Sequence, residues 1–401
     1  MKKKTMVMTI RVVALAIGSL VLILKLGACV SRPGPTPISP VAPTLEAQAP
    51  APSLPVVEAG GERAEVGDAS FTPTQAEASL ALTTGSGLVY RGVNLSGAEF
   101  GTVPGVLGRD YGYPTQADVD YFVARGAKHV RLPFRHERLQ RALRAELDPA
   151  EWARLEAIVT YIASKGLSVA IEPHNSARFN GRVITDLEMG DFWGRVAKAS
   201  LGKPYTPRLM LNLTNEPHDM TTEVWLGLAK AAVKEIRRVG FTGKVLVPGN
   251  GWTGAMHWTS KWYGTSNSVL MQQVVDSNLA FEVHLYLDTD GSGGGRECVS
   301  AQVGVERLKG FVAWLKAQGR VGYLGEIGAP NTPTCALAVK NTLTYVESEP
   351  AVWIGWAWWS AGSRWRPDYQ LSIQPLVTDA GLSERPQLEW LLPFWRSQGC
   401  P

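Results

Sequence analysis

The sequence of 401 residues contains little cysteine, little histidine and almost no net charge. Four cysteines, at positions 29, 298, 335 and 400, are too few to hold a fold together by disulfides alone. Six histidines without an HExxH or CxxC spacing give weak support to a metal centre, and we expect no metal and no other cofactor. A formal charge of +4, from 40 basic and 36 acidic residues, provides no field that would attract nucleic acid.

Tryptophan, in contrast, is abundant, since its 14 copies outnumber the 11 tyrosines and the 10 phenylalanines. Such usage is well above that of ordinary globular proteins. We assign about half of the indole rings to the core. The others can serve as flat apolar platforms for a ligand that itself has flat apolar faces, as pyranose rings do.

Residues 1–29 have the pattern of a bacterial-type export signal. A basic start precedes an apolar stretch, residues 12–24, that is too short to cross a bilayer comfortably. The tetrad Leu26-Gly27-Ala28-Cys29 resembles a lipoprotein processing box. We therefore expect a lipid on Cys29 to anchor the exported protein to the cell or outer membrane, with plain cleavage and secretion as the alternative.

Residues 30–84 are rich in Pro and Ala, with eight prolines between positions 32 and 56. This segment lacks the apolar content that would offset its ordering entropy, so we predict a disordered, extended tether. From residue 85 to 401, short apolar runs alternate with amphipathic helical patterns, which is typical of βα units with a parallel sheet. We count eight such units. They predict an α/β fold, a (β/α)8 TIM barrel, as a single domain behind the tether.

The predicted strands begin near Leu88, His129, Ser168, Arg208, Lys244, Leu279, Val321 and Val352. Helical patterns follow several of them, at residues 115–125, 149–165, 222–239, 305–318 and 335–347. In such barrels the chemistry takes place at the C-terminal ends of the strands. Polar residues directly after an apolar run are therefore the candidates for function.

Seven of the eight predicted strands end in polar or aromatic residues. In chain order these are Arg131, His174 with Asn175, Asn215 with Glu216, Asn250 with Trp252, His284 with Tyr286, Glu326, and Trp358 with Trp359. Unpaired charges inside a barrel are costly, so we interpret the set as one functional rim. Glu216 ends strand four and Glu326 ends strand seven, which lets two carboxylates face each other across the mouth. This arrangement suits retaining glycoside hydrolysis, in which the carboxyl groups lie about 5–5.5 Å apart.

Taken in order, these residues resemble the family 5 glycoside hydrolases of clan A. The resemblance runs from about residue 92 to residue 393. It includes the strings GAEFG at 97–101, GWTGA at 251–255 and LDTDGSG at 287–293. Those longer strings are similar to an endo-β-1,4-glucanase subgroup of fungal and bacterial enzymes, which implies that residues 85–401 form a catalytic domain.

The resemblance implies a role for each matching residue. Glu216 is then the acid/base and Glu326 the nucleophile, while Asn215 contacts the 2-hydroxyl of the sugar in the cleavage subsite. Arg131 and Tyr286 hold Glu326 ionised and aimed, so we expect a low pKa for Glu326 and a protonated Glu216.

The remaining matches concern the walls of the subsite. His174 and Asn175 at strand three and His284 at strand six border the cleavage subsite, and Trp359 stacks under its sugar. Trp252 and Trp365 are further platforms, with a core or surface role as the alternative. One position departs from the pattern. Glu172 stands where relatives of this subgroup usually carry Asp, which puts in doubt how His174 is held.

The sequence therefore predicts a monomeric, retaining endo-β-1,4-glucanase with a β-glucan polysaccharide as substrate. The same barrel acting on mannan, xylan or mixed-linkage glucan is one alternative, because the catalytic pair is indifferent to the identity of the sugar. A surface protein that binds glycans without hydrolysing them is another. The presence of both carboxylates with their supporting residues argues against it.

Two loops carry separate predictions. Cys298 and Cys335 lie in neighbouring βα loops of an exported protein, so we predict a disulfide between them, with Cys400 unpaired. The loop that begins at Asp288 imitates the start of a calcium loop, but its twelfth position is Val299 in place of a bidentate Glu. We interpret it as a glycine-shaped turn near the substrate groove.

Overall fold

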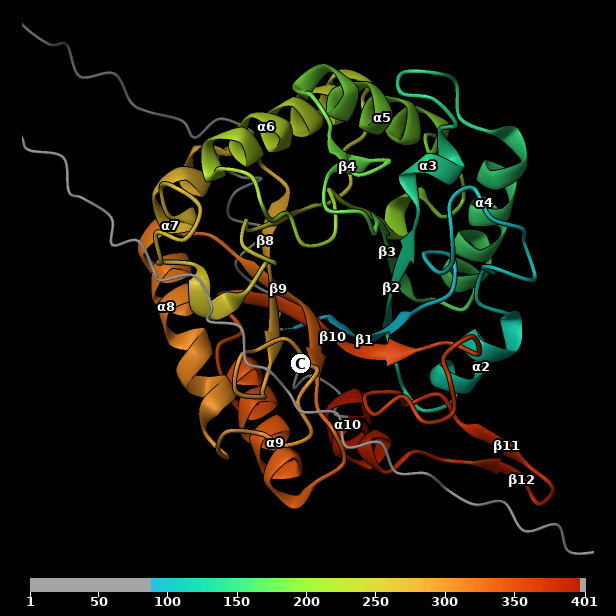
Figure 1. Ribbon diagram of the computed structural model, residues 1–401, viewed down its shortest axis with the longest axis vertical. Coiled ribbons are helices and arrows are strands. Elements are labelled where there is room, and N and C mark those ends of the chain that lie inside the picture. Colours follow the sequence, from blue (N-terminus) through green and yellow to red (C-terminus); the bar gives the residue numbers. More distant parts are fainter. Residues whose placement is uncertain (1–87, 397–401) are drawn as a thin grey trace, which may run out of the picture. The chain divides into compact units, whose positions relative to one another are not determined.

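The computed structural model describes residues 88–396. Eight parallel strands close into a barrel in the order β1-β10-β9-β8-β7-β6-β3-β2, and helices surround it (Figure 1), which confirms the predicted TIM barrel. The barrel strands are β1 Tyr90–Leu95, β2 His129–Phe134, β3 Ser168–Pro173, β6 Leu209–Asn212, β7 Val245–Pro248, β8 Leu279–Tyr286, β9 Gly322–Gly328 and β10 Trp353–Ala361. Each begins within two residues of its predicted start.

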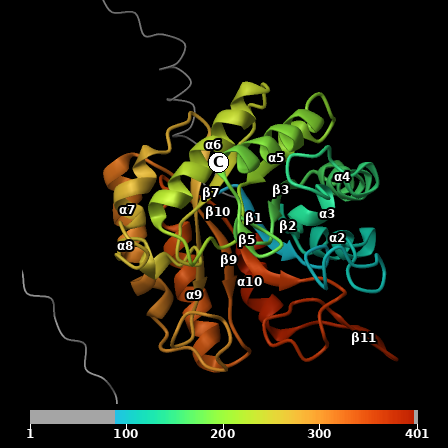
Figure 2. The same ribbon diagram turned by 45° about the horizontal axis from the view of Figure 1, so that its top comes forward.

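The helices follow the strands in sequence and pack on the outside of the barrel (Figure 2). They are α2 Gln116–Val123, α3 His136–Leu139, α4 Pro149–Ser164, α5 Asp186–Ala199, α6 Thr222–Arg238, α7 Asn267–Leu270, α8 Val303–Gln318, α9 Pro333–Glu347 and α10 Pro386–Arg396. Local sequence sets their ends. Asp148 caps α4 ahead of a proline at the first helical position, and Gly319 ends α8 in the left-handed conformation that glycine adopts most easily.

Two small antiparallel hairpins decorate the barrel, β4 Arg178–Phe179 with β5 Arg182–Val183, and β11 Leu376–Thr378 with β12 Gly381–Ser383. The predicted export signal, Cys29, the tether and Cys400 lie outside the described residues. Within residues 88–396, no helix combines the length and the apolar character that a bilayer crossing requires.

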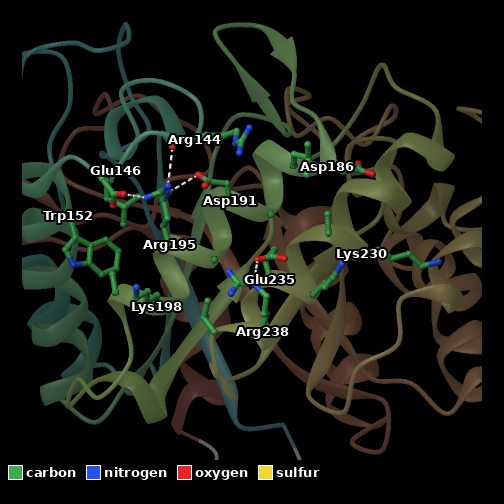
Figure 3. A pocket seen from close by; sticks show the side chains of 18 of the residues that line it. Arg144, Glu146, Trp152, Asp186, Asp191, Arg195, Lys198, Lys230, Glu235 and Arg238 are labelled. Carbon is green, nitrogen blue, oxygen red and sulfur yellow. Dashed lines mark hydrogen bonds and ion pairs between the residues drawn. The ribbon is translucent and has the colours of Figure 1, made fainter.

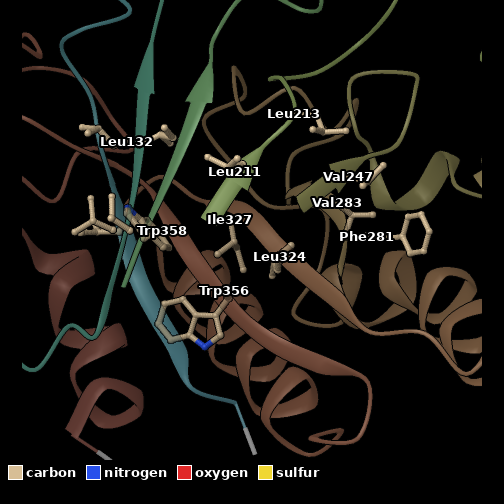
Figure 4. Packing of buried hydrophobic residues seen from close by; sticks show 14 of the residues in the cluster. Leu132, Leu211, Leu213, Val247, Phe281, Val283, Leu324, Ile327, Trp356 and Trp358 are labelled. Carbon is tan, nitrogen blue, oxygen red and sulfur yellow. The ribbon is translucent and has the colours of Figure 1, made fainter. Parts of the chain in front are cut away.

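The core has two parts, one on each face of the barrel wall. The larger part fills the space between strands and helices and includes Leu211, Val247, Phe281, Leu324 and Trp356 (Figure 4). The smaller part plugs the floor of the barrel with Ala170, Met210, Leu246, Ala280, Tyr323 and Ala357. Above this floor the inward positions become polar, so the apolar filling of the barrel ends where the candidate site begins.

Eight of the 14 tryptophans belong to the larger core, in agreement with the predicted half. One of them corrects the predicted rim. Trp358 points outward from β10 toward the helices and is therefore fully buried. Its indole Nε1 donates to the carbonyl of Leu371. Asn250 is also structural, since its amide donates to the carbonyl of Met220 beneath the loop after β7.

A bulge in β9 decides which way Glu326 points. In the pairing with β8, Val283 lies opposite Leu324 but His284 lies opposite Glu326, so Gly325 is an extra residue. Strict alternation would send Leu324 and Glu326 to the same face. The bulge breaks it. Leu324 and Ile327 therefore both pack in the outer core, while Glu326 turns into the barrel mouth.

Only glycine fits at the bulge. A Cβ atom at Gly325 would lie 1.9 Å from Oε1 of Glu282, a buried side chain on the neighbouring strand. The side chain of Asn94 fixes the bulge from the other side by donating to the carbonyl of Gly325 at 2.9 Å. Gly325 thus determines the direction in which the side chain of the next residue, Glu326, points.

Candidate active site

Arg131 stands at the centre of the barrel mouth with its side chain fully buried among three carboxylates. Its guanidinium lies 3.0 Å from Glu282, 2.9 Å from Glu326 and 3.4 Å from Glu172. Burial alone would lower the pKa of Arg131, but the three negative charges raise it well above its ordinary value. A permanent cation is therefore built into the floor of the site.

Glu326 receives two strong donors at the end of β9. Nη1 of Arg131 donates to Oε1 at 2.9 Å, and the hydroxyl of Tyr286 donates to Oε2 at 2.5 Å. Both donors fix the plane of the carboxylate and favour its ionised form. Arg131 and Tyr286, the two side chains predicted to support Glu326, thus both contact its carboxylate.

Glu216 faces Glu326 from the end of β6. Its backbone has a φ of 41°, which is uncommon for a residue other than glycine, and its side chain is 24% exposed. Nδ1 of His284 lies 2.8 Å from Oε1 of Glu216. One carboxylate oxygen of Glu216, Nδ1 of His284 and one oxygen of Glu326 all lie within 4.8 Å of one another. Such a set could also approach a cation, but both oxygens of Glu326 already accept hydrogen bonds from Arg131 and Tyr286.

The pKa values of the pair in the free cleft differ from the expectation. Burial raises the pKa of Glu326, and the lowering by His284 and Arg131 does not fully offset it. Burial also acts on Glu216, but the hydrogen bond and charge of His284 hold the pKa of Glu216 below its ordinary value. Arg131 thus lowers the pKa of Glu326 as expected, but burial outweighs this effect and the pKa of Glu326 lies above its ordinary value.

His284 connects Glu216 and Glu326 to a third carboxylate, that of Glu282. Burial would lower the pKa of His284, but Glu326, Glu216 and Glu282 together raise it to about 10. Nε2 of His284 lies 3.6 Å from Oε1 of Glu282, which also accepts from Asn212 at 2.7 Å. Glu282 therefore holds both Arg131 and His284 from beneath the reacting pair.

A closed ring of polar contacts forms the other side of the site. Nη2 of Arg131 donates to Oδ1 of Asn215 at 2.9 Å, and Nδ2 of Asn215 lies 3.3 Å from Nε2 of His174. Nδ1 of His174 lies 2.6 Å from Oε1 of Glu172, which returns to Arg131. Burial would lower the pKa of His174, but Glu172 raises it above the ordinary value. The Glu in place of the usual Asp therefore holds His174 firmly.

Aromatic rings line the mouth near β10. The indole of Trp359 stacks on the imidazole of His174, with ring centres 5.3 Å apart and planes 13° apart. Its Nε1 donates to the hydroxyl of Tyr369 at 3.0 Å, and Tyr369 stacks on Trp365 at 3.9 Å. Both predicted platforms, Trp359 and Trp365, thus lie in one continuous aromatic wall.

Two further predicted site residues take no part in these polar contacts. The amide of Asn175 donates to the carbonyl of Arg178 and organises the β4–β5 hairpin. Trp252 is 37% exposed and stacks on His218, beyond the carboxylate pair.

Sequence reasoning missed Glu282 and Tyr369. The signal for Glu282 was present, because alternation along β8 puts it on the same inward face as His284 and Tyr286. Tyr369 comes from an irregular segment after β10 with no periodicity to follow.

The loops around the mouth agree with the two separate predictions. Cys298 and Cys335 form a disulfide with a sulfur–sulfur distance of 2.01 Å, which ties the loop after β8 to the start of α9. In the loop that starts at Asp288, the carboxylate accepts from the backbone amides of Gly293 and Gly295 at 3.1 and 2.8 Å. Asp288 thus shapes a glycine turn through backbone contacts.

A groove of about 1160 Å³ lies outside the barrel between α5 and α6. We call it the α5–α6 groove. The two helices approach closely because Gly190 and Gly194 of α5 face Glu235 of α6. Figure 3 shows Arg195 between Glu146 and Asp191 in this groove. Neither Glu216 nor Glu326 lines it, so its volume reflects the packing of the helices outside the barrel.

Comparison with known proteins gives concordant matches. Endo-beta-1,4-glucanase B of Emericella nidulans is 33% identical over 295 residues, covering 72% of this chain and 87% of the relative. Endoglucanase 3 of Humicola insolens is 35% identical over 289 residues, covering 71% of this chain and 72% of the relative.

Solved structures agree with these relatives. An endo-beta-1,4-glucanase from Xanthomonas axonopodis pv. citri superposes with a TM-score of 0.74 at 40% identity, covering 77% of this chain and 99% of the other. XacCel5A in complex with cellopentaose superposes with a TM-score of 0.73 at 37% identity, with the same coverage. The family profile described as Cellulase (glycosyl hydrolase family 5) matches residues 86–362. The chain is therefore a glycosidase that belongs to the cellulase family, glycosyl hydrolase family 5.

Proposed function

We propose that this glycosidase is a retaining endo-β-1,4-glucanase that hydrolyses internal bonds of cellulose or a related β-glucan by double displacement. The closeness of the carboxyl groups carries the proposal, since one oxygen of Glu216 lies within 4.8 Å of one oxygen of Glu326. Inverting enzymes separate their carboxyl groups by about 6.5–9.5 Å to admit a water molecule. The endoglucanase relatives and the cellopentaose complex of a structural neighbour support a β-glucan as substrate.

In the first step, Glu326 attacks the anomeric carbon while Glu216 protonates the departing oxygen. A sugar bound over Glu216 excludes water from a side chain that is 24% exposed in the free cleft. That exclusion raises the pKa of Glu216 toward its role as an acid. Arg131 and Tyr286 meanwhile keep two donors on the attacking carboxylate.

In the second step, the charge of Glu326 has been consumed in the ester to the sugar. Glu216, which gave its proton to the leaving group in the first step, now accepts a proton from the attacking water. The water oxygen bonds to the anomeric carbon as the ester bond breaks, which frees the carboxylate of Glu326 and releases the sugar with its original β-configuration. Asn215, held by Arg131, contacts the 2-hydroxyl during both steps.

Rescue by azide tests the division of roles. Glu216→Ala should still form the ester from an aryl β-cellobioside with a good leaving group, and azide should then yield the β-glycosyl azide. Glu326→Ala cannot form the ester, so azide should give the α-glycosyl azide. An exchange of the two anomers between the variants would reverse the assignment, and an α-configured first product from the wild type would refute retention.

The preferred polymer is tested separately by time courses on carboxymethyl cellulose, mixed-linkage glucan, xylan and mannan. We expect fast loss of viscosity on carboxymethyl cellulose with little release of reducing ends, because internal bonds are cut. Higher kcat/KM on xylan or mannan would replace the proposed substrate but leave the mechanism intact.

A further inference from the structure

Three aromatic side chains form a surface beyond the reacting pair, which we call the outer platform: Trp252, Trp262 and Tyr263. Trp252 is 37% exposed and Trp262 is 50% exposed, although both are large apolar side chains. Their ring centres lie 5.2 Å apart, and Tyr263 stacks on Trp262 at 5.7 Å with planes 16° apart. Exposed apolar rings gathered in one patch are typical of a binding surface.

The surrounding backbone fixes this platform before any ligand arrives. The amides of Gly251 and Trp252 both donate to the carbonyl of Pro217, at 2.9 and 3.1 Å. The hydroxyl of Tyr263 donates to Oδ1 of Asp219 at 2.8 Å, and the amide of Thr222 donates to the carbonyl of Tyr263 at 2.9 Å. Rings held in this way lose little conformational entropy when they bind a sugar.

The platform lies on the Glu216 side of the cleft. His218 stacks on Trp252, with ring centres 4.8 Å and planes 7° apart, and Nδ1 of His218 lies 2.7 Å from the carbonyl oxygen of Glu216. Trp252 follows β7, which lies across the closed strand order from β10, the strand that carries Trp359. The two aromatic surfaces therefore flank the carboxylate pair from opposite sides.

The Glu216 side of the cleft is the leaving-group side, because Glu216 delivers its proton to the oxygen of the leaving group. Sugars bound past Glu216 are those that depart in the first step. The wall at Trp359 and Trp365 then serves the sugars that remain attached to Glu326.

We propose that Trp262 and Tyr263 extend the leaving-group side of the cleft beyond Trp252 and bind additional glucosyl units of a β-1,4-glucan by stacking. The inference rests on the proposed function, since it takes the substrate and the role of Glu216 from it. These two residues would then set the minimum chain length for rapid cleavage and the position of the cut.

Two substrates distinguish sugar binding on the leaving-group side from a general effect on the enzyme. Cellohexaose reaches the leaving-group side with glucosyl units, whereas 4-nitrophenyl β-cellobioside places only a phenolate there. In Trp262→Ala we expect kcat/KM on cellohexaose to fall about three- to tenfold, the loss expected for one stacking contact. On the aryl cellobioside, kcat/KM should stay within a factor of two of the wild type. Cellopentaose labelled with ¹⁸O at its reducing end should be cut at a different bond, with fewer units in the leaving product.

Trp152→Ala supplies a matched control, because Trp152 lines the α5–α6 groove away from the cleft. Trp152→Ala should leave kcat/KM on both substrates, and the position of the cut, as in the wild type. Tyr263→Phe keeps the ring and removes the contact with Asp219. Its kcat/KM on cellohexaose should therefore lie between the values for the wild type and for Trp262→Ala.

Two results would overturn the proposal. Unchanged hydrolysis of cellohexaose by Trp262→Ala would mean that the indole contacts no sugar, and equal losses on both substrates would indicate a role in folding. Failure of the proposed function is distinguishable, because the wild type would then leave both substrates intact.

Discussion

The barrel mouth and the α5–α6 groove each place an arginine between carboxylates, but they differ in their access to water. The side chain of Arg131 is fully buried among three acidic groups. The side chain of Arg195 remains 27% exposed beside Glu146 and Asp191. The groove has a volume of about 1160 Å³, but its charged groups are partly exposed, which weakens the ion pairs between them.

Because the charged groups of the barrel mouth are buried, they indicate where the functional site lies. A buried ion is costly unless its partners satisfy it, so the cluster of Arg131 with three buried carboxylates at the centre of the barrel indicates a functional site. The pKa of His284 shows the strength of these contacts, since Glu326, Glu216 and Glu282 raise it to about 10 although burial acts to lower it. In this molecule, buried charge identifies the site and cavity volume does not.

Removing Arg131 should give the largest effect. In Arg131→Met, the carboxylates of Glu172, Glu282 and Glu326 lose their common cation while their side chains stay buried. We expect the free energy of unfolding to fall by about 3–5 kcal/mol and kcat/KM on an aryl cellobioside to fall at least about 1000-fold. Denaturant unfolding and steady-state kinetics measure the two quantities. A stable variant with near-normal activity would show that the buried charges are not coupled.

The bulge at Gly325 offers a second test, because it aims Glu326 without touching substrate. Gly325→Ala puts a methyl group where Oε1 of Glu282 now lies, at a distance of 1.9 Å. Glu282 or β9 has to move, and a displacement of about 1 Å at the reacting groups can lower kcat about 100-fold. Gly310→Ala in α8 is the control, since its nearest neighbour atoms would lie 3.8 Å away. Equal activity of the two variants would contradict the role of the bulge.

The sequence predicted the barrel and the carboxylate pair because both depend on local signals. Apolar runs placed the strands, and the polar residues that end β2, β6, β8 and β9 indicated the rim. The direction of single side chains was harder to predict. Trp358 seemed to belong to the rim, but alternation along β10 puts it on the same outward face as Trp356, in the outer core.

Contacts between distant segments explain the remaining differences. The pKa of Glu326 in the free cleft depends on burial by the whole barrel, which no short motif encodes. The aromatic pair of Trp365 and Tyr369 forms only because an irregular segment folds back over β10. The disulfide could be predicted because its two loops are neighbours in the order of βα units.

A smaller effect is expected at Glu172, which closes the ring through His174. Glu172→Gln keeps the size of the side chain but removes the charge that raises the pKa of His174. Burial then prevails, so the pKa of His174 should fall and the imidazole should lose its proton at a lower pH than in the wild type. NMR titration of the histidine side chains measures the shift, and we expect about a tenfold loss of kcat/KM alongside it.

Glu172→Asp distinguishes charge from reach at the same position. It restores the negative charge but shortens a side chain that now lies 2.6 Å from Nδ1 of His174. We expect the pKa of His174 to stay closer to that of the wild type than in Glu172→Gln. If both variants leave the pKa of His174 unchanged, Glu172 does not control the protonation of the ring.

The smallest effect should come from the groove, and it tests the comparison directly. Arg195→Met removes a guanidinium that contacts Glu146 and Asp191, much as Arg131→Met removes one from Glu282 and Glu326. Water can hydrate the acidic groups that remain, because Arg195 is 27% exposed and Glu146 is 88% exposed. The free energy of unfolding should therefore change by at most about 1 kcal/mol, and less in high salt, which screens exposed pairs. Activity on the aryl cellobioside should match the wild type, since no residue of the groove contacts the carboxylate pair. A loss near that of Arg131→Met would mean that exposure does not separate the two regions, and the argument from buried charge would fail with it.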